Sequence, residues 1–93
     1  MSDKSAEATE KMKKQISEAL QTAKTLRDEI RVELHLAGLD AQARWKELEP
    51  RLKDTERFGG EVSEAARTAA MSVARSFQEF KAALKRHGQD SHP

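Results

Sequence analysis

Carboxylates and an imidazole between residues 29 and 35 are the side chains whose spacing comes closest to a chemical site. Glu29 and Glu33 are four residues apart, so a helix would place both carboxylates on one face, as general acid–base catalysis requires. The same spacing is common on charged, solvated helices, and we interpret the two glutamates as surface residues. His35 lacks the Glu-x-x-His spacing of metal sites in helical bundles, and we interpret it as a surface or interface residue.

The other reactive residues do not combine into a site. His87 and His92 stand near the C-terminal end without a third ligand, and the sequence contains no cysteine. Gly59 and Gly60 lack the lysine and serine of a phosphate-binding loop, and three serines between residues 63 and 76 have no histidine–aspartate partner. We therefore predict no catalytic, metal-binding or cofactor-binding residue, and a protein that is not an enzyme.

The composition is typical of long helices. Hydrophobic residues make up 37% of the chain and charged residues 35%, with a net charge of +1. Charges of the two signs are interspersed, whereas a nucleic-acid-binding protein concentrates positive charge on one face or in one tail. The first residues are polar, with no apolar core of a signal peptide and no membrane-spanning run later, so we predict a cytoplasmic location.

One long apolar stripe organises the first half of the chain. From Met12 to Leu52 apolar or small residues recur at steps of three or four, which is the period of a helix. Gly38 and Pro50 interrupt the stripe, because glycine destabilises a helix interior and proline removes a hydrogen bond. Since the spacing continues through both, we predict a helix over residues 7–57 that bends there, with proline starting a new first turn as one possibility. The alternative is that Gly38 ends the first helix and residues 39–57 form a separate one.

A second helix is predicted over residues 61–86. Phe58-Gly59-Gly60 ends the first helix, and the second has acidic residues in its first turn and basic residues in its last. A short Gly-Gly turn makes consecutive helices antiparallel neighbours. We therefore predict an all-α fold, an antiparallel helical hairpin, as a single domain over residues 1–93 with flexible ends at 1–5 and 88–93.

Folding this hairpin about Gly59 pairs positions whose numbers add to about 118, and bulky side chains then face small ones. Phe80 meets Ala37 and Gly38, so we interpret Gly38 as a notch for the Phe80 ring and expect Gly38→Leu to overpack it. The predicted core consists of Leu34, Ala37, Gly38, Ala41, Trp45, Leu48, Leu52, Val62, Ala66, Ala69, Val73, Phe77, Phe80 and Leu84.

The N-terminal arm of the long helix predicts a partner. The second helix would cover the first only back to about Ile30, which leaves four large apolar residues of the arm without a neighbour. Burying four such side chains is worth about 6–12 kcal/mol. We predict a homodimer in which two arms pair, as in a helical bundle or coiled coil; the alternative is an arm that folds back at Gly38 to give a three-helix monomer. The predicted interface residues are Met12, Ile16, Leu20, Leu26, Ile30, Val32, Leu36 and Leu39.

These patterns favour function by contact rather than by chemistry. We predict a small non-catalytic helical protein that acts through protein–protein contact, as a self-assembling, scaffold or adaptor protein, with a second copy or another helical protein as partner. The alternative is an amphipathic protein of membrane surfaces or one associated with nucleic acid. The apolar face of the second helix is mostly alanine between Ala65 and Ala74, and alanine gains little from contact with lipid.

Overall fold

The computed structural model describes the backbone of residues 2–58 and 61–90 and the side chains of residues 7–58 and 61–86. Four helices follow one another: α1 (Ser2–Leu34), α2 (Leu39–Leu48), α3 (Pro50–Glu56) and α4 (Glu64–Asp90). There is no strand in this part of the chain. The predicted all-α fold is confirmed.

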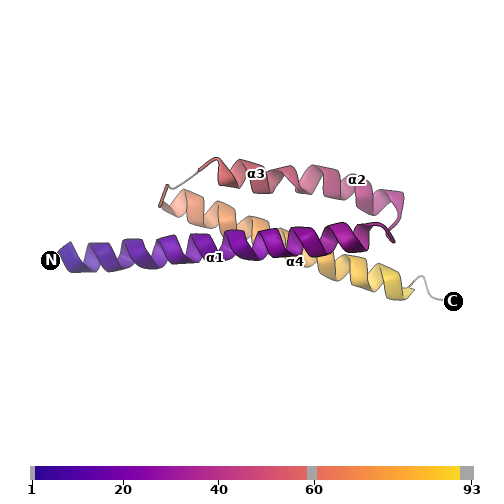
Figure 1. Cartoon of the computed structure of the whole chain (residues 1–93), viewed down its shortest axis with the longest axis horizontal. Helices are drawn as coiled ribbons and strands as arrows, with labels where there is room; N and C mark the ends of the chain where they lie inside the picture. The colour runs from indigo at the N-terminus through magenta and orange to yellow at the C-terminus, as the bar shows by residue number, and fades with distance from the viewer. Residues whose placement is uncertain (1, 59–60, 91–93) are drawn as a thin grey trace.

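The helices form an elongated bundle of 63 × 21 × 16 Å. Figure 1 shows that the chain runs along α1, reverses, returns through α2 and α3, and reverses again into α4. Consequently α1 and α4 point in the same direction, and the bent rod made of α2 and α3 runs against both. This is the three-helix arrangement that was the alternative to the hairpin.

The prediction of one helix over residues 7–57 is wrong, because the chain reverses between α1 and α2. The connection spans residues 35–38, and its backbone N–H groups at Leu36 and Ala37 donate to Glu33 and Leu34 at 3.0 and 3.1 Å. A connection of this length matches about one helical turn of 3.6 residues. The three-to-four-residue spacing of apolar residues therefore continues through the connection, and the sequence pattern does not reveal the reversal.

Pro50 restarts a helix rather than ending the rod. Helix α2 stops at Leu48, Pro50 is the first residue of α3, and Glu49 between them keeps helical angles of φ −55° and ψ −42°. The N–H of Glu49 still donates to the carbonyl of Trp45 at 2.8 Å. Proline is tolerated in a first turn because its missing N–H has no intrahelical acceptor there. The possibility of a restart at Pro50 is confirmed.

Gly38 is not a notch for Phe80, and that prediction is wrong. It precedes α2 as the N-cap, with φ −72° and ψ 172°, an extended conformation that any residue adopts. A Cβ atom built at this position would meet no atom within 4 Å. The expected overpacking of Gly38→Leu against Phe80 therefore has no physical basis in this fold. The Phe80 ring lies against Trp45 instead, with ring centroids 5.4 Å apart.

Helices α1 and α4 make the most extensive contact in the bundle. Polar contacts fix their parallel register: Arg67 donates to Gln15 at 3.2 Å, and Lys81 pairs with Glu29 at 2.9 Å. From about Met12 onward, each residue of α1 thus lies beside the residue of α4 about 52 positions later. Several residues at this interface are alanines, which let the two backbones approach closely. Ala23, Ala66 and Ala70 are all at most 2% exposed.

The centre of the core is an aromatic cluster. The Trp45 ring lies 4.9 Å from the ring of Phe77, centroid to centroid, in a tilted arrangement that aromatic pairs prefer. Phe77 and Ile30 are both completely buried, so α1, α2 and α4 meet at this level. The contact of Trp45 with Phe77 shifts the helix pairing by about one turn from the predicted sum of 118. The reason is that α4 begins at Glu64, three residues later than predicted.

The predicted core residues divide into three groups. Five are buried: Trp45, Leu52, Ala66, Val73 and Phe77. Eight are half-buried: Leu34, Ala37, Ala41, Leu48, Val62, Ala69, Phe80 and Leu84. Gly38 alone is exposed.

The arm of the first helix has neighbours within its own chain, so the reason given for an interface there is wrong. Ile16 packs with Ala66 and Ala70 of α4, with Met12 and Leu20 half-buried beside them. Leu26 and Ile30 join the aromatic cluster. Folding back at residues 35–38 covers this stripe with α4, which removes the cost of leaving it in water.

The helix ends differ slightly from prediction. Ser63 caps α4, because its hydroxyl accepts the backbone N–H of Ala66 at 3.1 Å. Helical backbone includes residues 2–5 and extends to Asp90, beyond the predicted limits. The Gly59-Gly60 turn and the extreme ends, residues 1 and 91–93, lie outside the described residues.

Candidate functional site

A ridge of exposed apolar side chains marks the end of the bundle where α1 turns into α2. Val32 is 71% exposed, Leu36 94% and Leu39 82%. Val32 lies in the last turn of α1, Leu36 in the connection and Leu39 at the start of α2. We call these three residues the apolar ridge. All three belong to the predicted interface set, whereas Ile16 and Ile30 of that set are buried inside the chain.

An open groove of about 680 Å³ lies beside the ridge. It is bounded by the end of α1, the connection, the start of α2 and the last turns of α4, and Leu36 and Leu39 form part of its wall. We call this cavity the end groove. Its other apolar lining residues are Ala37, Ala41, Phe80, Ala83 and Leu84.

Four charged side chains also line the end groove, two of each sign: Glu33, Asp40, Arg44 and Lys85. Within the described part of the chain, none of them belongs to an ion pair. The Oε2 atom of Glu33 is buried and has no hydrogen-bond partner among the residues described. A buried oxygen without a partner is costly, and Glu33 is therefore a strained point of the groove wall.

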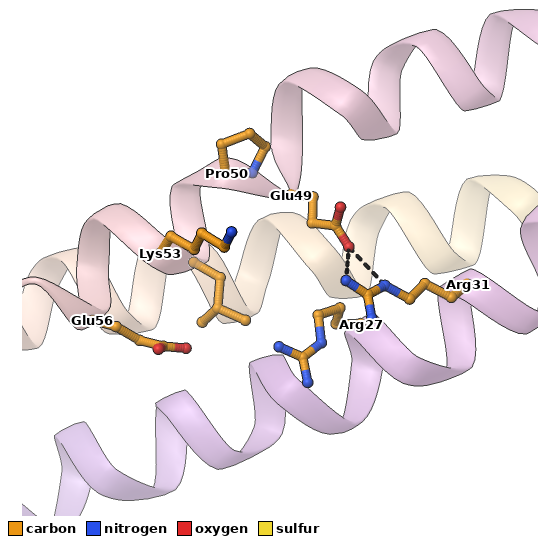
Figure 2. A pocket seen from close by; sticks show the side chains of 7 residues that line it. Arg27, Arg31, Glu49, Pro50, Lys53 and Glu56 are labelled. Carbon is orange, nitrogen blue, oxygen red and sulfur yellow. Dashed lines mark hydrogen bonds and ion pairs between the residues drawn. The ribbon is translucent and has the colours of Figure 1, made fainter.

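A second, smaller cavity of about 260 Å³ separates α1 from the bend between α2 and α3. Figure 2 shows Arg27 and Arg31 of α1 on one side of it and Glu49, Lys53 and Glu56 on the other. The guanidinium of Arg31 contacts Glu49 Oε2 through Nε at 2.7 Å and a terminal nitrogen at 2.6 Å.

This ion pair accounts for the smaller cavity in structural terms. Arg31 and Glu49 are 56% and 32% exposed, and pairs that contact water in this way contribute about 0–1 kcal/mol. Its position joins α1 to the residue just before Pro50. We therefore interpret Arg31 and Glu49 as a structural ion pair between α1 and the bent rod, and not as a ligand site.

The residues singled out for chemistry do not assemble into a site. Glu29 pairs with Lys81, whereas Glu33 lines the end groove outside any ion pair of the described residues, so the two carboxylates do not share a site. His35 is exposed in the connection. The side chain of His87 and the whole of His92 lie outside the described residues.

Two of the three serines, Ser72 and Ser76, lie on α4, exposed and half-buried respectively, and Ser63 is the α4 cap. The part of the chain with described side chains contains no cluster of three histidine or carboxylate groups able to hold a metal ion. These residues are accounted for by helix capping, ion pairing and solvent exposure.

Comparison with known proteins identifies no relative of this chain. No protein family, curated protein or solved structure matches this chain. The functional argument therefore depends on the surface itself. Among the described residues, no helix is both long and apolar enough to cross a lipid bilayer.

Sequence reasoning missed the end groove and several buried residues. Thr55 is 6% exposed, with its hydroxyl donating to the carbonyl of Arg51 at 2.9 Å, and it was not assigned to the core. Ala70 and Ala74 were also missed, although they follow Ala66 at steps of four. That spacing was the available signal: α4 packs against two neighbours, so its apolar face is wider than one stripe.

Proposed function

We propose that this protein is a non-catalytic helical protein that acts through protein–protein contact, and that the apolar ridge with the end groove makes this contact. The observation that carries the proposal is the exposure of three large apolar side chains in succession beside an apolar groove. Two of these residues, Leu36 and Leu39, line the groove itself, and exposed apolar patches on soluble proteins often mark interaction sites. A cytoplasmic location is part of the same proposal.

The ridge alone supports at most a weak contact, because association itself costs about 4–15 kcal/mol. Fully burying one valine and two leucine side chains contributes about 5–9 kcal/mol before the cost of association is subtracted. What remains is in the range of transient interactions, so the proposed role is a scaffold or adaptor whose partner is a second copy or another helical protein. This places the contact at the end of the bundle instead of along the arm.

A membrane-surface role is the less favoured alternative. The charges around the groove are two acidic and two basic, whereas binding to anionic lipid relies on an excess of basic residues. The ridge has three apolar residues at a corner between two helices, not a continuous apolar face along one helix. Both features favour a protein partner.

The proposal is tested by placing a photo-crosslinking amino acid at Leu36 in the full chain within its source cells. Illumination is expected to give crosslinked protein adducts from this position. The matched control carries the same amino acid at Lys46, which is exposed on α2 but outside the groove, and is expected to give at least tenfold less. Equal adduct yields from the two positions, or no protein adduct from position 36, would contradict the proposal.

A further inference from the structure

We propose that the surface covering the end groove is the same surface of a second copy, so that two chains pair end to end about a two-fold axis. This inference rests on the proposed function and names its partner. A two-fold interface brings one patch against itself, so any residue pair formed across it is formed twice. A self-complementary patch must therefore contain both protruding side chains and a groove that can receive them.

The end of the bundle meets that requirement. Leu36 and Leu39 protrude into solvent at 94% and 82% exposure, and they stand at the wall of the groove that would receive the same residues of the other copy. The groove is large enough for such side chains, with about 680 Å³ of open space. Phe80 and Leu84 are half-buried and supply apolar surface inside it.

Small residues allow the second backbone to approach. Ala37, Gly38 and Ala41 line one side of the groove, and Ala83 lines the α4 side. Beside Gly38 there is open space, because a Cβ atom built there meets nothing within 4 Å. The space beside Gly38 is therefore available to a neighbouring chain, since the Phe80 ring does not occupy it.

The charges around the groove are complementary to themselves. Glu33 and Asp40 are acidic, Arg44 and Lys85 are basic, and none of the four is in an ion pair within the described residues. A two-fold operation can place the acidic pair of one copy opposite the basic pair of the other. A partner with charge of one sign, such as nucleic acid, would meet two like charges.

The test exchanges the signs of these charges. One double variant, Glu33→Lys with Asp40→Lys, makes the groove wholly basic; another, Arg44→Glu with Lys85→Glu, makes it wholly acidic. In sedimentation experiments from 1 µM to 500 µM, a range chosen to span roughly millimolar to micromolar affinities, wild type is expected to form a dimer. The dissociation constant of the dimer is expected to be roughly a hundredfold higher for each variant alone than for wild type. An equimolar mixture of the two variants is expected to restore dimers.

The matched control for the basic variant is Glu47→Lys with Asp54→Lys, which makes the same change in net charge as that variant at exposed positions outside the groove. It is expected to dimerise like wild type. Circular dichroism checks that each variant is folded; if a double variant loses helicity, Leu36→Asp replaces it, with the same expected loss of dimer.

Three results would overturn the inference: a wild type that stays monomeric throughout, groove variants that dimerise like the control, or a mixture that stays monomeric. The proposed function fails on a different result. If the purified chain is monomeric but position 36 crosslinks to another protein in cells, contact through the end groove stands and only the second copy as its partner is rejected.

Discussion

Ile30→Asp is expected to unfold the protein, whereas Val32→Asp on the same helix is expected to leave it folded. Ile30 is completely buried and Val32 is 71% exposed, although only two positions separate them. Losing the burial of Ile30 costs about 1.5–3 kcal/mol, and placing an unpaired carboxylate there adds several more. That sum is comparable to the whole stability of a domain, about 5–15 kcal/mol.

Val32→Asp should cost no more than about 1 kcal/mol, the penalty for a negative charge near the C-terminal end of a helix. The measurement is the free energy of unfolding from urea titration followed by circular dichroism. Low micromolar protein keeps association from contributing to the result. Similar losses of stability in the two variants would contradict the burial of one face of α1 by α4, as would a folded Ile30→Asp protein.

Phe77→Ala is expected to lower the free energy of unfolding by about 3–5 kcal/mol, as large truncations in cores do. The ring is completely buried and lies 4.9 Å from that of Trp45, so its removal opens a cavity where α2 meets α4. The emission of Trp45, the one tryptophan of the chain, reports the same event by shifting toward that of a solvated indole.

The matched control for this truncation is Phe58→Ala, because Phe58 is 40% exposed. Its partial burial predicts a loss of about 1–2 kcal/mol. Equal losses in the two phenylalanine variants, measured in the same urea titration, would show that the aromatic cluster does not hold the helices together.

Local sequence patterns predicted the helices well because helix formation depends on neighbouring residues. The three-to-four-residue spacing, the restart at Pro50 and the charge order of the last helix all follow from interactions within a few turns. The direction in which the second helix continues from the first does not follow from such local interactions. The same spacing is compatible with a bend or a reversal at residues 35–38, since the connection takes up about one turn.

What decided the reversal is the burial of the α1 stripe, and this is a property of the whole chain. Ile16 would face water in an extended hairpin and is buried when α1 lies on α4, where Leu20 and Leu26 are also half-buried. Leu36 and Leu39 are exposed at the corner where the chain reverses. The sequence could assign Val32, Leu36 and Leu39 to the predicted interface, whereas the groove beside Leu36 and Leu39 follows from tertiary packing.

The reversal at residues 35–38 creates the end surface, so the most direct test is the distance between α1 and α4. Ser17→Cys and Thr68→Cys place spin labels at two exposed positions within one turn of the contact of Gln15 with Arg67, in a chain without other cysteines. Labelled protein is diluted with excess unlabelled protein, so that only distances within one chain are measured. Helices in contact are about 8–10 Å apart, so the labels should be separated by less than about 25 Å. A separation of about 50 Å, as a continuous helix through Gly38 would give, would contradict the fold and the contact surface derived from it.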